Sequence, residues 1–146
     1  MITGYDHWEA WPAGTVNALT IKNNVFFPTG PEPTGNRAIF VNGTYKSFRQ
    51  VDISANTNIG ADQNSWRTTR ATLTLTQQAT TKWVFDFNAL LVFPDQIEKV
   101  VYSVTSASTT WFQHVARPAN RGVVVVETSV PVDATVSIEV SQGLTP

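Results

Sequence analysis

Few residues in this sequence of 146 could support catalysis. Asp86 and Glu127 lie on or next to expected core strands, and two carboxylates that flank a sugar can hydrolyse a glycosidic bond. Nothing in the sequence places these two side by side. Asp86 interrupts an apolar run, where an unpaired buried charge would be costly, so we expect it to face water or to pair with an arginine such as Arg70. We therefore predict that the protein is not an enzyme.

Histidine and cysteine chemistry is equally sparse. The sequence has no cysteine and only two histidines, so disulfides and thiolate metal sites are excluded. We interpret His114, in an expected aromatic strand, as a hydrogen-bonded packing residue. His7 and Glu9 would lie on one side of an extended segment, but zinc sites use three or four protein ligands. With no G-x-S-x-G, phosphate-binding glycine loop or H-E-x-x-H motif, we predict no catalytic residue, no metal and no cofactor.

Aromatic side chains are the remaining candidates for binding. Five tryptophans offer flat faces on which a sugar ring or a partner protein could pack. We assign Trp83 and Trp111 to the core because both lie in expected strands. For Trp66, two other interpretations stay open: an anchor of its loop to the core, and a cation–π cluster with neighbouring arginines. The candidate partner-binding residues are Tyr5, Trp8, Trp11 and Trp66.

The longest apolar segment, residues 83–93, organises the expected fold. All its odd positions are apolar, which is typical of one buried face of a strand, and its even positions are mixed. Because this is long for one strand, we expect a bulge or bend at residues 86–88. Threonine and leucine alternate over residues 72–76, so residues 71–93 are predicted to form one long hairpin with its loop at 77–81.

Short strands with intervening turns account for the rest of the chain. Asn42-Gly43 predicts a hairpin over residues 37–48, because this dipeptide suits a type I′ turn. One or two short strands are expected in 15–27, and a long polar loop in 54–65. The last group comprises strands at 98–105, 110–116, 123–126 and 135–141, of which 123–126 is expected to be central, with turns at 106–109, 117–122 and 128–134.

This pattern predicts an all-β fold. An antiparallel β-sandwich, either jelly-roll or immunoglobulin-like, and a small barrel are the alternatives, each with an irregular aromatic N-terminal arm. We find no internal repeat. The expected organisation is a single domain over residues 1–146, with an arm at 1–14, a β core at 15–142 and a tail at 143–146.

Composition limits the classes of partner. Charged residues make up 14% of the chain and the net charge is −1, so there is no basic surface to attract nucleic acid. The apolar runs are far shorter than the ~20 residues that cross a bilayer. The first residues lack the basic and apolar parts of a secretion signal, so we expect a protein made in the cytoplasm without export by that route.

Sparse charge, a Thr- and Asn-rich surface and the aromatic arm favour contacts with other protein subunits. With no secretion signal, no cysteine, one methionine, Thr- and Val-rich strands and the aromatic N-terminal arm, the whole chain resembles bacteriophage virion proteins of the capsid-decoration or tail type. The resemblance implies a non-enzymatic structural protein, present in the virion as a homo-oligomer and binding other virion subunits. The alternative is a carbohydrate-binding β-sandwich that uses tryptophan faces and loop amides to bind glycans.

Overall fold

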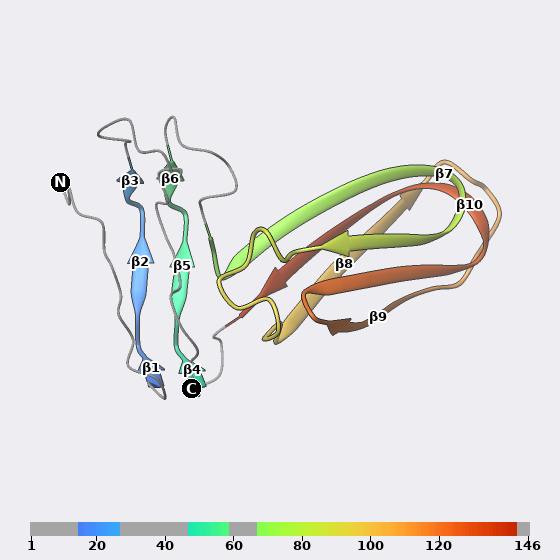
Figure 1. The fold of residues 1–146 in the computed structure, drawn as a ribbon. Helices are drawn as coiled ribbons and strands as arrows, with labels where there is room; N and C mark the ends of the chain where they lie inside the picture. Colours follow the sequence, from blue (N-terminus) through green and yellow to red (C-terminus); the bar gives the residue numbers. More distant parts are fainter. Residues whose placement is uncertain (1–14, 27–46, 59–66, 143–146) are drawn as a thin grey trace, which may run out of the picture.

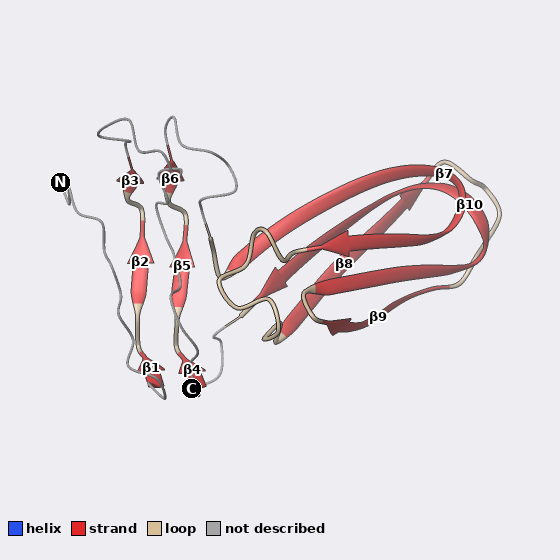
Figure 2. Ribbon diagram, viewed as in Figure 1, coloured by secondary structure: helices blue, strands red, loops and turns tan. Residues whose placement is uncertain are grey.

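The computed structural model describes residues 15–26, 47–58 and 67–142 (Figure 1). Every described regular element is a β-strand, which confirms the predicted all-β class (Figure 2). The strands form two regions. We call β1 to β6 the parallel turns and β7 to β10 the sandwich.

The parallel turns contain six short strands and the sandwich four longer ones. They are β1 (Thr15–Asn17), β2 (Thr20–Lys22), β3 (Val25–Phe26), β4 (Ser47–Arg49), β5 (Asp52–Ser54), β6 (Thr57–Asn58), β7 (Arg70–Asp86), β8 (Lys99–Ser106), β9 (His114–Asn120) and β10 (Val123–Ser141).

The parallel turns are two passes of the chain stacked in constant register. Thr15 pairs with Ser47, Thr20 with Asp52 and Val25 with Thr57, an offset of 32 residues each time. The corners match too, because the positive-φ residues obey the same offset: Ala18 with Gln50 and Asn23 with Ala55. The structure thus contains a repeat that we did not find in the sequence. Its trace there is short: Leu19-Thr-Ile-Lys-Asn-Asn24 aligns with Val51-Asp-Ile-Ser-Ala-Asn56.

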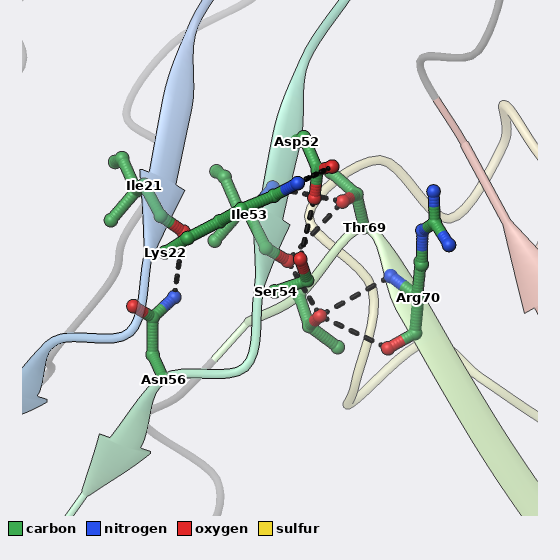
Figure 3. Close-up of polar contacts among 9 residues, drawn as sticks. Ile21, Lys22, Asp52, Ile53, Ser54, Asn56, Thr69 and Arg70 are labelled. Carbon is green, nitrogen blue, oxygen red and sulfur yellow. Dashed lines mark hydrogen bonds and ion pairs between the residues drawn. The ribbon is translucent and has the colours of Figure 1, made fainter.

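Asparagine side chains join the two passes at one corner. Asn56 is 6% exposed. Its Oδ1 accepts two hydrogen bonds from Asn24, one from the backbone N–H at 3.0 Å and one from the side-chain Nδ2 at 3.1 Å. The Nδ2 of Asn56 donates to the carbonyl of Ile21 at 2.9 Å (Figure 3). These bonds pair backbone groups that the bend removes from the ladder. A small apolar cluster around Val51 and Ile53 fills the interior beside them.

The sandwich is one four-stranded antiparallel sheet that doubles back on itself. The first half of β10 lies between the end of β7 and β9, and its second half lies between the start of β7 and β8. Figure 1 shows β7 and β10 curving over together at the end of the sandwich where the two halves meet. The register of β10 against β7 shifts between Glu127 and Val132 and again before Ala134. These irregularities allow both strands to pass from one layer to the other.

Two sequence predictions fail at this corner. Residues 71–93 do not form a hairpin, because the two halves of β7, on either side of the bend at residues 77–81, pair with β10 and not with each other. Ala79 has a φ of 47°, and its backbone N–H donates to Asp133 Oδ1 at 2.7 Å. Residues 128–134 likewise continue β10 instead of separating two strands. Polar composition marked the corner correctly, but the same composition serves a hairpin loop and a strand that changes layer.

Apolar side chains from both layers meet in the interior. Trp83 and Phe85 of β7 face inward with Val124 and Val126 of β10, and all four are 1% exposed or less. The second half of β10 contributes Val136, Ile138 and Val140, each 0% exposed. Burial of such side chains stabilises a fold by about 1.5–3 kcal/mol each. The predictions that Trp83 is core and that 123–126 is a central strand are confirmed.

Asp86 ends β7, so the apolar run 83–93 is not one strand. Its Oδ1 accepts hydrogen bonds from the backbone N–H of Asn88 at 2.9 Å and from Asn88 Nδ2 at 2.8 Å. Asn88 Nδ2 also donates to the carbonyl of Arg121 in the turn between β9 and β10. In that turn Gly122 has a φ of +75°, and an added Cβ would lie 2.7 Å from Asn88 Oδ1. Asp86 therefore has a structural role: it is exposed and shapes a turn.

A short segment connects the two regions. The backbone N–H of Thr69 donates to the carbonyl of Ile53 at 2.9 Å, and the N–H of Ile53 donates to the Thr69 hydroxyl at 2.9 Å. Thr69 in turn accepts from the backbone N–H of Gln142, which is 1% exposed and directly follows β10. The chain leaving the sandwich thus packs against the segment that stacks on the parallel turns.

Candidate functional site

A surface hollow of about 520 Å³ lies at the open edge of the sandwich. β8 and β9 are edge strands of opposite layers, and the segment of residues 107–113 connects them. We call the cavity the Trp111 hollow. Its lining comes from the end of β8, the connecting segment and the start of β9: Val104, Ser106, Ser108, Thr109, Thr110, Trp111, Phe112, Gln113 and His114.

A contact between Tyr102 and His114 spans the two layers beside the hollow. Tyr102 lies on the inward face of β8 and is half-buried. His114 is the first residue of β9. The Tyr102 hydroxyl and His114 Nδ1 are hydrogen-bonded at 3.2 Å, and the two rings pack edge to face with centroids 5.6 Å apart. Phe112 packs against the same imidazole at 6.2 Å. These contacts agree with the interpretation of His114 as a hydrogen-bonded packing residue, although its side chain is exposed.

Hydroxyl groups fix the path of the connecting segment. Ser106 Oγ donates to the carbonyl of Asp133 at 2.7 Å and accepts from the backbone N–H of Ser108 at 3.1 Å. Ser108 Oγ accepts from the N–H of Thr110 at 3.1 Å. Beyond Trp111, the N–H of Gln113 donates to Ser129 Oγ, and the N–H of Ser129 donates to the Gln113 carbonyl. The segment is therefore anchored on both sides of Trp111.

Trp111 is 88% exposed, so its assignment to the core is wrong. The strand expected at residues 110–116 begins only at His114, and none of the described strands covers the indole. A free aromatic face beside hydroxyl and amide groups has the character of a sugar-binding surface. The C–H face of a pyranose can pack on the ring while its hydroxyls bond to polar neighbours. A run of five small residues, 106–110, of which four carry hydroxyl groups, was the available signal that this strand starts late.

The other aromatic candidates cannot be placed against this site. Tyr5, Trp8, Trp11 and Trp66, predicted to bind a partner, lie outside the described residues, as do the arm and residues 37–46 of the expected hairpin; its last two residues, 47 and 48, lie in β4. The domain boundaries and the partner role of these four residues stay predictions.

The two carboxylates considered for hydrolysis are far apart. Asp86 pairs with Val123, and Glu127 lies four residues further along β10, which places them about 13 Å apart along the strand. Paired carboxylates in glycosidases lie about 5–10 Å apart. Each is also occupied: Asp86 shapes its turn, and Glu127 Oε2 binds Arg117 Nε at 2.6 Å. This pair is not a catalytic centre.

A polar cluster in the parallel turns has a structural function. Lys22 and Asp52 form an ion pair between adjacent strands, and Ser54 Oγ donates to Asp52 Oδ1 at 2.6 Å (Figure 3). Burial raises the pKa of Asp52, but the bonds from Lys22 and Ser54 outweigh it and hold the pKa below the ordinary value of 3.8. The cluster stabilises the pairing of β2 with β5, because the side chains of Lys22, Asp52 and Ser54 bind one another.

The described residues form neither a cluster of metal ligands nor a membrane-spanning helix. Among them, no three His, Asp or Glu side chains gather where a metal ion could bind. In the same residues, no helix has the length and apolar character needed to cross a membrane.

Comparison with known proteins links the chain to a carbohydrate enzyme. Polygalacturonase QRT3 from Arabidopsis thaliana is 31% identical over 133 residues, which are 90% of this chain and 27% of the relative. The chain thus spans about a quarter of the length of that protein. No protein-family model matches the sequence. No solved structure matches it.

This relative corrects two predictions. The expected function as a virion structural component is wrong, because the match is to a polygalacturonase and carries no link to a virus particle. The prediction that the protein is not an enzyme is contradicted as well, since the relative is an enzyme by its name. The sequence showed neither because it contains no catalytic motif that we recognised. The resemblance in style to phage proteins, the homo-oligomer, the partners and the localisation are not tested by this match and stay predictions.

Proposed function

We propose that the protein binds carbohydrate and that the Trp111 hollow is its sugar-binding site. The observation that carries the proposal is the 88% exposure of the Trp111 indole beside a hollow rich in hydroxyl and amide groups. A sugar ring that packs on the exposed indole removes the apolar ring face from water. The N–H at the edge of the indole can stay hydrated. The polygalacturonase relative supports the same substrate class.

The test is a glycan-binding measurement with a matched pair of variants. Trp111→Ala is expected to abolish binding while leaving the circular dichroism spectrum unchanged, because the indole lies outside the core. Val84→Ala removes another exposed apolar side chain, 50% exposed on the outer face of β7, and is expected to bind like the parent. Binding that survives in Trp111→Ala, or a blank array with the parent protein, would overturn the proposal.

The relative's name also favours a second candidate, hydrolysis of glycosidic bonds in galacturonans. Because Asp86 and Glu127 do not pair, we propose that any cleavage depends on other carboxylates. Release of new reducing ends from polygalacturonate measures it. Asp86→Asn and Glu127→Gln are then expected to retain the activity of the parent, whereas a large loss in either would return that residue to the catalytic centre. Absence of any release from the parent would remove this candidate.

A further inference from the structure

Among the described residues that line the Trp111 hollow there is no Lys, Arg, Asp or Glu. Its polar groups are neutral hydroxyls and an amide, together with the imidazole of His114, which already bonds to Tyr102 through Nδ1. Its apolar groups are the rings of Trp111 and Phe112 and the side chain of Val104. Such a surface can bind an uncharged sugar ring but offers no formal charge to pair with an anion.

One described cation, Arg117, lies three residues beyond His114 in β9. It forms an ion pair with Glu127 and lies opposite Val125, whose side chain faces away from the core. Asp133 binds Ser106 through its backbone carbonyl, whereas its carboxylate accepts from the backbone N–H of Ala79. Among the described residues no cluster of His, Asp and Glu could hold a bridging metal ion either. These groups thus provide no unpaired cation to compensate the charge of a carboxylate ligand.

A galacturonan in its free-acid form carries one carboxylate on each ring. Proteins bind such groups with arginine or lysine, or through a calcium ion, because an anion that loses water needs a compensating charge. We infer that the Trp111 hollow takes an uncharged pyranose ring, either a neutral sugar or the methyl-esterified form of a galacturonan, and discriminates against the free acid. This inference rests on the proposed function and names the chemical class of its ligand.

Three sets of oligosaccharides of equal length test it: unesterified oligogalacturonates, their methyl esters, and neutral oligogalactosides. Binding to the full chain is measured by calorimetry. We expect the esters or the neutral sugars to bind at least about fivefold more tightly than the free acids, a typical effect of one exposed charge. Their affinity is expected to stay constant from about 0.05 to 0.5 M NaCl, because no ion pair is formed.

A variant that adds a cation sharpens the test. Gln113 lines the hollow with an exposed side chain, so Gln113→Lys is expected to raise the affinity for the free acids several-fold relative to the affinity for the esters. Gln113→Met, of similar length and without charge, is the control and should give no such gain.

The outcomes separate the two proposals. Free acids that bind the parent as tightly as the esters, with an affinity that falls as salt rises, would overturn the inference and leave carbohydrate binding standing. If none of the three sets binds while the variants remain folded, carbohydrate binding itself fails. Tighter binding of the esters would identify a methyl-esterified galacturonan as the ligand, and tighter binding of the galactosides would identify a neutral sugar.

Discussion

The sandwich and the parallel turns differ in what holds their strands together. In the sandwich, an apolar interior of Trp83, Phe85 and the valines of β10 lies between two layers. In the parallel turns, the apolar cluster is small, and the buried polar residue Asn56 and the Lys22–Asp52 pair connect one pass to the next. Burial of apolar area is additive and non-directional, whereas these polar links depend on a constant register. The difference predicts that the two regions respond to different perturbations.

The largest expected effect is in the sandwich. Trp83→Ala removes a fully buried indole and should lower the free energy of unfolding by about 3–5 kcal/mol. Its Nε1 has no hydrogen-bond partner, so no polar link is lost with it. Urea denaturation followed by far-UV circular dichroism measures the loss. Val84→Ala, the exposed neighbour on β7, is the control and should change stability by less than about 0.5 kcal/mol. Equal effects in both variants would show that the interior is not organised as described.

An intermediate effect is expected in the parallel turns. Asn56→Ala deletes three hydrogen bonds between the passes and should destabilise this region by about 2–3 kcal/mol. Hydrogen exchange should report faster exchange of the Thr57 amide, which donates to Asn24, with the amides of β10 less affected. Thr57→Ala, an exposed change at the next residue, which begins β6, is the control. Uniformly faster exchange in both regions would mean that they unfold as one unit and that the contrast is only structural.

The smallest expected effect is a dependence on pH. The pKa of Asp52 is lower in the folded protein than its ordinary value of 3.8, so folding favours the charged carboxylate. Its contribution is complete above the ordinary pKa and is lost as the pH falls through the lower pKa of the folded state. Asp52→Asn should lack this component, and the stability difference between parent and variant should shrink as the pH falls below about 4. A difference that stays constant with pH would contradict the ion pair as a stabilising link.

Local patterns were sufficient for several features. Alternation placed Trp83 and Phe85 on the inner face of their strand, and the run 123–126 predicted a central strand that β7 and β9 do flank. The strand expected at 98–105 is β8, displaced by one residue. These predictions succeeded because the side-chain period of a strand is a local property of the chain.

The candidate site was less accessible to sequence reasoning. Trp111 lies next to Phe112 in a segment with strand-like composition. Its indole is exposed because none of the described strands packs over it. The carbohydrate alternative was drawn from the number of tryptophans, but the residues chosen for it did not include Trp111. The exposure of a side chain depends on residues that are distant in sequence. Composition can therefore indicate which types of residue form a site, but not which individual residues do.

By itself, the sequence determined the all-β class, the inward faces of the core strands and the neutral, hydroxyl-rich surface. Tertiary structure alone decided which strands pair. The 32-residue register, the passage of β7 and β10 between layers and the position of Trp111 at an open edge all depend on non-local contacts. The physical reason is that a strand is specified by its own alternation, whereas its partners and its solvent exposure are specified by whatever folds against it.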